Sequence, residues 1–268
     1  MSGYVGVRSV AEKIDKLYVG DGASLAQVVQ KAYVGDPRGV AELWYQLGTP
    51  LGDRAVGGKV YFNVNNIRTE WIIVHQGLPG AMYDASCSGA WLLMKDIYES
   101  RQWDSSNTND YANSTIHSYL NSTFLNLFES NIKNAIKQVK IPYRKGHGIS
   151  TTVTSGSNGL SAKIFLLSAT ETSFSYSYMP RGEGAELAYF KGCADNGSDS
   201  RRVAYLNGSA TGWWLRSPGC NITSKRALEV GSNGDCGDTG CSNSHGIRPA
   251  LIMPSTTLVD GEGNVLGG

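Results

Sequence analysis

The chain has 268 residues, a formal net charge of +1 and a hydrophobic content of 41%, which suit one large domain with a small additional module. The balanced charge argues against nucleic acid as the main partner, because phosphate binding needs a concentrated positive patch. No stretch approaches the ~18 consecutive apolar residues of a membrane helix, so no membrane insertion is expected. The 33 glycines, against 8 prolines, favour many turns and short strands over long helices.

The first residues of the chain do not resemble a targeting segment. Met1 to Gly6 show no basic region followed by an apolar run, so the sequence predicts no signal peptide. We therefore expect synthesis in a cytosol without ordinary secretion, with free thiols as the default state of the five cysteines.

A 15-residue repeat opens the chain. Residues 10–21 match residues 25–36, and a third copy starts at residue 40. Apolar positions alternate within each copy and Gly-Asp ends the first two, so each copy predicts one strand pair closed by a turn. A β-patch of ~40 residues buries too little surface to stand alone. We therefore assign residues 1–48 to a module that packs on the main domain, on a larger structure, or on copies of itself in a homo-oligomer.

A Gly- and Pro-rich linker leads into the main domain, which we assign to residues 57–268. Alternating apolar residues at 60–64 predict a half-buried strand, and the Asn65-Asn66 pair predicts the turn that follows it. Residues 70–75 predict the returning strand. Residues 90–98 are apolar on most faces, which favours a central strand, with a short buried helix as the alternative.

Helices are expected in the next section of the chain. Asn113 or Ser114 is placed to cap one helix, and residues 121–123 are placed to cap a second one that continues to residue 139. Residues 163–168 then predict a buried strand. The expected fold class is α+β, with short strands and a few helices.

Near the C-terminus, two framework-like segments enclose a polar stretch. The first is Gly-Trp-Trp-Leu-Arg-Ser-Pro at residues 212–218, and the second is Gly-Ile-Arg-Pro-Ala-Leu at residues 246–251. Paired tryptophans supply large apolar surface, and Pro and Gly fix turns, so both segments predict a rigid framework. An arginine guanidinium has five donors that can tie loop carbonyls together, which favours a structural role for the arginines over ligand contact. The predicted scaffold residues are Trp213, Trp214, Arg216 and Arg248.

The enclosed stretch, residues 220–243, is polar, Gly-rich and irregular. Its Asn233-Gly234 pair predicts a tight hairpin turn. Binding residues tend to lie on loops held by a fixed scaffold, so this stretch is the candidate ligand-binding surface, with an ordinary solvated hairpin as the alternative. The candidate ligand-binding residues are Cys220, Asn221, Ile222, Ser224, Lys225, Arg226, Glu229, Gly231, Asn233, Asp235, Cys236, Asp238, Thr239 and Gly240.

The two framework segments resemble those of C-type-lectin-fold domains in proteins of bacteriophages and gut bacteria, some of which are variable proteins of diversity-generating retroelements. The resemblance covers roughly residues 57–258 and implies a C-type-lectin-like domain whose segment near 220–243 is mutagenised to alter ligand binding. It implies a protein made in the bacterial cytoplasm and carried in the virion, in the phage tail, for attachment to a host cell-surface protein or glycan.

One feature departs from that family, because its variable segments are usually rich in Asn and Tyr and residues 220–241 contain no Tyr. The chain is therefore either an already diversified copy or a non-diversifying relative. The N-terminal repeat is similar to short Tyr-Val-Gly repeat modules of phage tail and baseplate-associated proteins. This second resemblance implies contacts with other phage tail proteins, and a β-extension of the main domain is the alternative.

Motifs of enzymes are largely missing: the sequence has no P-loop, no His-Glu-x-x-His and no Gly-x-Ser-x-Gly. We predict no enzyme activity, no cofactor and no metal site, since Asp235 and Asp238 supply too few oxygens for calcium. The formylglycine-generating family has a related fold and a reactive cysteine pair, so Cys236 with Cys241 defines the alternative enzyme hypothesis. A structural virion protein without a specific ligand is a third hypothesis. His245 is the histidine closest in sequence to the predicted surface.

Overall fold

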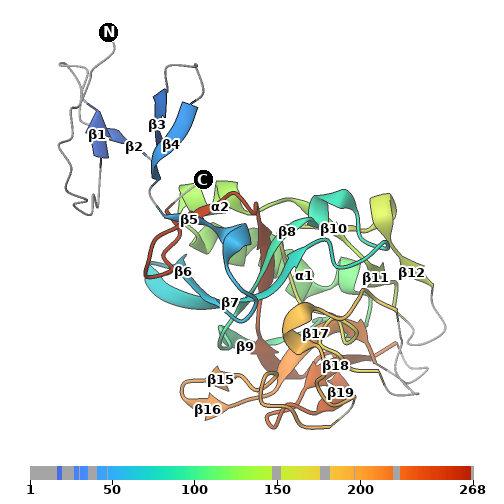
Figure 1. The fold of residues 1–268 in the computed structure, drawn as a ribbon. Helices are drawn as coiled ribbons and strands as arrows, with labels where there is room; N and C mark the ends of the chain where they lie inside the picture. Colours follow the sequence, from blue (N-terminus) through green and yellow to red (C-terminus); the bar gives the residue numbers. More distant parts are fainter. Residues whose placement is uncertain are drawn as a thin grey trace. The chain divides into compact units, whose positions relative to one another are not determined.

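The computed structural model describes residues 17–19, 27–29, 31–35, 41–46, 48–146, 152–175, 182–195, 197–219 and 224–266. The chain divides into two compact units, Met1–Thr49 and Pro50–Gly268 (Figure 1). The division falls within the Gly- and Pro-rich segment that precedes the predicted main domain.

The described residues of the smaller unit form two antiparallel strand pairs, β1 with β2 and β3 with β4. The second repeat copy supplies both β2 and β3, and these strands pair with the neighbouring copies instead of with each other. The prediction of one strand pair within each copy is therefore wrong for this copy. A single residue separates β2 from β3, which is too short for a hairpin turn. The strands are β1 (Leu17–Val19), β2 (Gln27–Val29), β3 (Lys31–Gly35) and β4 (Ala41–Gln46).

The larger unit contains a five-stranded antiparallel sheet in the order β14-β21-β8-β7-β6. β8 is its central strand and is buried along its whole length, so the strand predicted at residues 90–98 is confirmed up to Met94 and the helical alternative is wrong. Asn65 and Asn66, with φ angles of 51° and 62°, form the predicted turn between β6 and β7. The strands are β6 (Lys59–Val64), β7 (Ile67–Gly77), β8 (Gly89–Met94), β14 (Ile164–Phe165) and β21 (Ala250–Met253).

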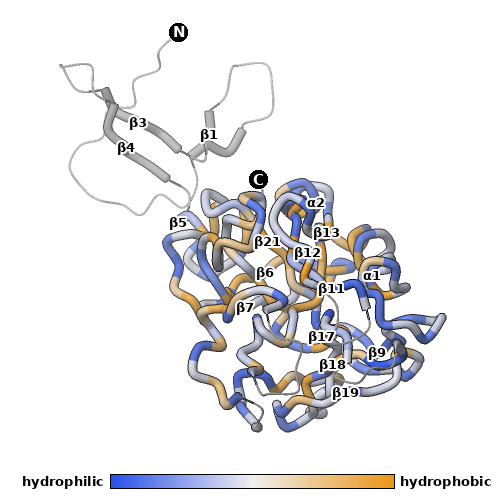
Figure 2. Tube along the Cα trace, turned by 90° about the vertical axis from the view of Figure 1, so that its right-hand side faces the viewer, coloured by the Kyte–Doolittle hydropathy of each residue, from blue (hydrophilic) through white to orange (hydrophobic). Residues whose placement is uncertain are grey.

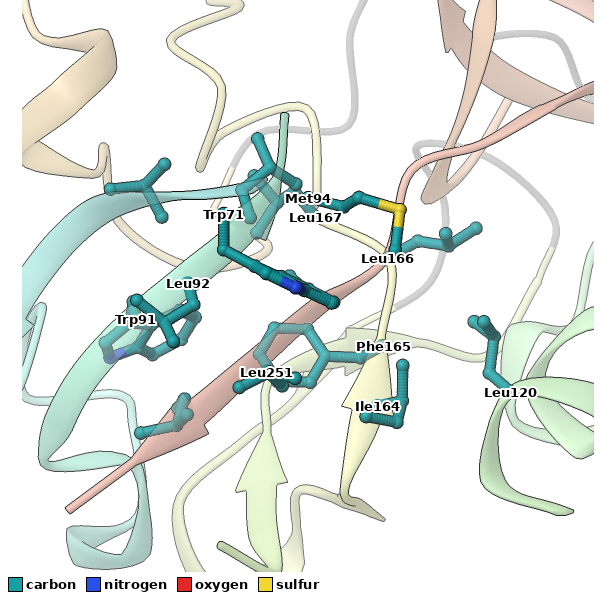
Figure 3. Packing of buried hydrophobic residues seen from close by; sticks show 14 of the residues in the cluster. Trp71, Trp91, Leu92, Met94, Leu120, Ile164, Phe165, Leu166, Leu167 and Leu251 are labelled. Atoms are coloured by element: carbon teal, nitrogen blue, oxygen red, sulfur yellow. The ribbon is translucent and has the colours of Figure 1, made fainter. Parts of the chain in front are cut away.

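Large apolar side chains from this sheet form the main core (Figure 3). Trp71, Trp91, Phe165 and Leu251 come from β7, β8, β14 and β21 and have no exposed surface. The rings of Trp91 and Phe165 meet edge to face with 5.5 Å between their centroids. Burial of each such side chain contributes about 1.5–3 kcal/mol. Hydrophobic stretches gather inside the larger unit and its loops are mostly hydrophilic (Figure 2).

A second five-stranded sheet has the order β19-β18-β17-β20-β9. β17 contains most of the first framework segment and β20 contains the first two residues of the second, and these strands lie side by side as a parallel pair, whereas the other neighbours are antiparallel. Early and late parts of the chain therefore share this sheet. The strands are β9 (Glu99–Gln102), β17 (Trp213–Pro218), β18 (Arg226–Val230), β19 (Cys236–Gly240) and β20 (Ser244–Ile247).

The helical section begins as predicted and then differs. Ser114 caps α1 (Thr115–Tyr119) by accepting a hydrogen bond from the His117 amide at 3.2 Å. The chain continues without a break through a π-helical turn (Leu120–Phe124) and a 3-10 turn (Leu125–Leu127), so the predicted second cap is wrong. The Asn121 side chain instead binds the backbone of Ile164, donating to its carbonyl at 2.9 Å.

The second helix, α2 (Ser130–Ala135), ends earlier than predicted. Val139 belongs to a strand because it pairs with Ala162 across a short antiparallel ladder. The predicted strand at 163–168 is confirmed only over Ile164–Phe165, although Leu166 and Leu167 are buried.

The remaining elements are short. No helix in the described part of the chain is long and apolar enough to cross a membrane. The larger unit is an α+β fold in which strands dominate. The short strand pairs are β5 (Thr49–Pro50) with β22 (Leu258–Val259), β10 (Val139–Ile141) with β13 (Leu160–Ala162), β11 (Tyr143–Arg144) with β12 (Val153–Thr154), and β15 (Tyr205–Leu206) with β16 (Ser209–Ala210), and the other 3-10 turns are Leu51–Asp53, Ala85–Cys87, Tyr111–Asn113, Gly156–Asn158 and Ala188–Phe190.

Candidate ligand-binding surface

The polar stretch between the framework segments folds as the β18–β19 hairpin (Figure 1). Arg226 lies opposite Gly240 at one end of the ladder, and Val230 lies opposite Cys236 at the other. Gly234 has a φ of +84°, which confirms the turn predicted from Asn233-Gly234. The connecting loop is longer than a two-residue turn because residues 231–235 separate the strands.

The hairpin contributes to the core and to the surface at the same time. Ala227, Leu228 and Val230 of β18 are fully buried, whereas every described candidate ligand-binding residue is at least partly exposed. Cys220, Asn221 and Ile222 lie outside the described residues. We define the hairpin surface as the remaining candidates: Ser224, Lys225, Arg226, Glu229, Gly231, Asn233, Asp235, Cys236, Asp238, Thr239 and Gly240.

Several polar side chains of the hairpin surface already have hydrogen-bond partners within the protein. Arg226 Nε lies 2.9 Å from Asp238 Oδ2, and this hydrogen bond raises the pKa of the Arg226 guanidinium. Thr239 Oγ1 accepts a hydrogen bond from the side-chain amide of Asn243 at 2.9 Å. Such pairing orders the side chains before a ligand arrives, which lowers the entropy cost of binding.

The tip of the hairpin is fixed by Arg202, a fully buried residue that the sequence analysis did not single out. Its guanidinium donates to the Gly234 carbonyl at 3.4 Å and to carbonyls of residues earlier in the chain, including that of Thr172 at 2.8 Å. Gly234 also lies against the chain, because a Cβ there would stand 2.2 Å from the Asp199 carbonyl oxygen. Nothing in the local sequence distinguishes Arg202 from its neighbour Arg201.

The base of the hairpin is fixed by the loop that follows β9. The Asn109 amide donates to the Ser224 carbonyl at 2.8 Å, and its side chain donates to the Arg226 carbonyl at 3.0 Å. The Asp104 amide donates to the Cys241 carbonyl at 3.0 Å. Asn109 was also missed, since it stands in an Asn-, Asp- and Ser-rich stretch that indicates only a loop.

Glu229 and His245 form a pair near the middle of the hairpin. His245 Nδ1 lies 2.5 Å from Glu229 Oε2, and the two side chains are 28% and 15% exposed. The imidazole packs edge to face on Trp214 with 4.8 Å between the ring centroids. A Cβ at Gly237 would stand 3.0 Å from Glu229 Oε1, so the carboxylate lies directly against the β19 backbone. The pair offers hydrogen-bonding groups at the surface beside a buried indole.

The predicted scaffold tryptophans are buried in the second sheet. Trp213 and Trp214 have no exposed surface. Trp213 Nε1 donates to the Arg202 carbonyl at 2.9 Å, and Trp214 Nε1 donates to the Arg101 carbonyl at 2.8 Å. Each indole therefore fills the core and also connects β17 to a neighbouring segment.

Arg216 is buried between two glutamates. Its guanidinium binds Glu171 through two bonds of 2.5 and 2.7 Å, and it donates to the Pro142 and Leu166 carbonyls. Nε lies 3.7 Å from the carboxylate of Glu183, a second fully buried acid whose pKa is raised by burial. With no exposed surface, Arg216 cannot touch a ligand.

Arg248 has a similar place on the other side of the framework. It is 1% exposed, and its Nε donates to the Met94 carbonyl at 2.9 Å. The guanidinium carbon lies 5.0 Å from the Trp213 ring centroid, and burial lowers the pKa of Arg248 to about 10. Both framework arginines therefore bind backbone carbonyls inside the protein.

The two cysteines of the enzyme alternative are not brought together. Cys236 begins β19 and Cys241 follows its last residue, so five steps of about 3.3 Å put their backbones roughly 16 Å apart. The Cys241 thiol is buried, which raises its pKa to about 12. A reactive thiol needs a lowered pKa.

Within the described ranges, no three His, Cys, Asp or Glu side chains are grouped in a way that could hold a metal ion. The Asp238 carboxylate is paired with Arg226, and Asp235 Oδ2 accepts a hydrogen bond from the side-chain amide of Asn233 at 3.2 Å.

Comparison with known proteins assigns the family. The model of the family described as "Domain of unknown function (DUF6273)" matches residues 88–255, which is more than half of the 268-residue chain. The chain belongs to this family. The matched region contains both framework segments and the whole hairpin surface. The chain matches no curated protein and no solved structure.

Proposed function

We propose that the larger unit is a C-type-lectin-like ligand-binding domain of a phage or prophage tail protein. It presents the hairpin surface for attachment to a host cell-surface protein or glycan. The N-terminal unit joins the domain to other tail proteins. In this proposal the surface belongs to the variable segment of a diversity-generating retroelement protein, as the framework segments suggest by their resemblance.

The observation that supports the proposal most is the way the hairpin is held. Arg202 fixes its tip and Asn109 fixes its base, and both bind backbone carbonyls. Neither contact depends on the identity of a hairpin side chain, so the exposed positions can change while the backbone stays in place. A recognition surface that is altered repeatedly needs this separation between frame and contact residues.

Apart from Glu229, which is paired with His245, the surface side chains also contribute little to folding. The fully buried apolar side chains of the hairpin are Ala227, Leu228 and Val230, which are not candidate ligand-binding residues; among the candidates, Cys236 packs against the core and is partly buried. Substitution of partly exposed polar residues away from caps and cores usually changes stability by about 0.5 kcal/mol or less. Ligand binding can therefore be changed without loss of the fold.

A cell-binding assay tests the proposal. The full chain is labelled with a fluorophore and titrated onto a panel of gut bacterial strains. A hairpin variant combines Ser224→Ala, Lys225→Ala, Asn233→Ala and Thr239→Ala. A matched control removes one Ser, one Lys, one Asn and one Thr at exposed sites outside the hairpin, through Ser122→Ala, Lys191→Ala, Asn126→Ala and Thr123→Ala.

We expect saturable binding to at least one strain, lost in the hairpin variant and kept in the control. Equal binding by both variants would move the ligand site away from the hairpin surface. Absence of saturable binding to every strain would favour a structural virion protein without a specific ligand.

A further inference from the structure

The hairpin formed by β6 and β7 extends past the point at which β7 stops pairing with β8. β7 begins at Ile67, but its pairing with β8 begins only at Trp71. Residues Ile67–Glu70 therefore pair with β6 on one side. On the other side, no described strand lies next to them. We call Ile67–Glu70 the β7 overhang.

The register determines which backbone groups of the overhang face outward. The two-residue turn makes Val64 and Ile67 a hydrogen-bonded pair, so the backbone polar groups of Ile67 face β6. Those of Arg68 and Glu70 face the opposite side. The Glu70 carbonyl accepts from the Lys95 amide at 3.0 Å, in agreement with this direction. The Arg68 amide and carbonyl point the same way, and the described part of the chain places no strand against them.

A pocket of about 340 Å³ lies between the overhang and residues Met94–Tyr98. Its apolar lining includes Val64, Met94 and Ile97, which are nearly fully buried. Ile67 also lines it and is 67% exposed, the highest value among the large exposed hydrophobic residues of the described chain. The volume is at the lower end of the ~300–1,000 Å³ range of ligand sites, which suits one or two aliphatic side chains.

Charged groups line the same edge. Lys59 Nζ and Lys95 Nζ lie 3.1 and 3.9 Å from Glu70 Oε1, and Lys95 also lies 3.8 Å from Asp96. The Arg68 guanidinium lies over the Tyr61 ring, 3.7 Å from its centroid, and donates to Asn264 Oδ1 at 2.9 and 3.1 Å. Three cations and two carboxylates take part in these contacts, so the charged side chains around the overhang carry an excess of one positive charge.

We propose that the β7 overhang is a docking site for an extended peptide of a partner protein, which adds as a further strand beside Arg68. The outward amide and carbonyl of Arg68 supply the main-chain hydrogen bonds. Side chains alternate between the two faces of a strand, so one set enters the apolar pocket and the other meets the lysines and Arg68. The partner segment is therefore one in which apolar and acidic residues alternate. This site is separate from the hairpin surface, and the proposal does not depend on the function assigned there.

The probe is an acetylated and amidated heptapeptide, Thr-Glu-Val-Glu-Val-Glu-Thr, titrated into the isotope-labelled full chain and followed by amide chemical shifts. Arg68→Pro removes the outward amide, and proline is tolerated on an edge strand when its nitrogen faces away from the neighbouring strand. Arg68→Ala is the matched control, because it removes the guanidinium and keeps the amide. A third variant, Ile67→Ser, changes the pocket and leaves the backbone intact.

We expect shifts at Ile67–Glu70 in the wild type and in Arg68→Ala. Binding by Arg68→Pro should be at least about tenfold weaker than by Arg68→Ala, the effect of losing about 1.4 kcal/mol of main-chain hydrogen bonding. Ile67→Ser should weaken binding about fivefold, which keeps the proposal testable if Arg68→Pro does not fold.

Three results would overturn the proposal. Arg68→Pro could bind as tightly as Arg68→Ala, or millimolar peptide could leave the overhang amides unshifted. The overhang shifts could also follow protein concentration instead of peptide concentration, which would assign the edge to a second copy of the chain.

Discussion

His245 Nδ1 lies 2.5 Å from Glu229 Oε2, so a residue of β20, directly before the closing framework segment, contacts a residue of the hairpin surface across strand β17. The contact joins the part of the domain that is proposed to vary to the part that is proposed to stay fixed. Glu229 differs in this respect from hairpin positions such as Lys225, which is exposed.

Because this pair is partly buried, we predict that its loss costs more than an ordinary surface substitution. Glu229→Ala should lower the free energy of unfolding by about 1–2 kcal/mol, since it removes the partner of a half-buried imidazole. A double-mutant cycle with His245→Ala, measured by urea titration, should give a coupling energy of at least about 0.5 kcal/mol. Strict additivity of the two substitutions would show that the contact has no energetic role.

Because the frame is buried and the hairpin surface is partly exposed, substitutions in the two should lower the free energy of unfolding by very different amounts. Trp214→Ala should lower the free energy of unfolding by about 3–5 kcal/mol, because a fully buried indole leaves a cavity. Thr239→Ala should change it by only about 0.5 kcal/mol, because the side chain is partly exposed and its hydroxyl accepts from the exposed side-chain amide of Asn243. Denaturant titration of both variants checks the order, and similar costs would contradict the division into frame and surface.

Gly234 is predicted to be the backbone position on which the hairpin tip depends. Gly234→Ala would need φ near +84° and would place Cβ 2.2 Å from the Asp199 carbonyl oxygen, so we expect a loss of about 2–3 kcal/mol. Hydrogen exchange should become faster at Gly231 and Gly234, whose amides close the loop. Gly261→Ala is the control, since nothing lies within 4 Å of a Cβ there. Equal stability of the two variants would contradict the role given to the tip.

The buried acid Glu183 predicts a specific pH dependence. Burial raises its pKa above the ordinary value of 4.5, so the folded protein keeps this proton to higher pH than the unfolded chain does. The stability contributed by the protonated group is fully present below pH 4.5 and falls as the pH rises toward the folded pKa. Glu183→Gln lacks this titration, so its stability relative to the wild type should increase as the pH rises from 4.5. A difference that stays constant from pH 4 to about 8 would contradict the assignment.

The buried cysteines should be unreactive in the native state. Burial raises the pKa of Cys241 to about 12 and that of Cys87 and Cys193 to about 11, so few thiolates exist near neutral pH. Iodoacetamide at a pH of about 8, followed by peptide mass mapping, should modify these three residues only after denaturation. Rapid modification of native Cys241 would renew the cysteine-pair enzyme hypothesis.

The local sequence pattern was enough to predict elements that depend only on neighbouring residues, such as a half-buried strand or a tight turn. The alternation at Val60, Phe62 and Val64 predicted a strand with one buried face, and Asn65-Asn66 and Asn233-Gly234 predicted turns where the structure has them. The framework segments were identified from the tryptophans and arginines that are now seen to be buried.

Contacts between distant segments could not be read from the sequence. Asn121 looks like a helix cap, but its amide binds the backbone of Ile164, a partner 43 residues away. Arg202 and Asn109 hold the hairpin through backbone carbonyls, which leave no trace in composition or spacing. The β7 overhang depends on where β8 stops pairing, which is also a property of the assembled sheet.

The central claim, that the hairpin surface is a diversified binding surface on a fixed frame, is tested most directly by deep sequencing of this gene in sibling genomes from one population. We predict substitutions concentrated between Cys220 and Asn243, with Trp213, Trp214, Arg216 and Arg248 unchanged. Sparse changes spread evenly along the chain would contradict the claim and would indicate a fixed protein.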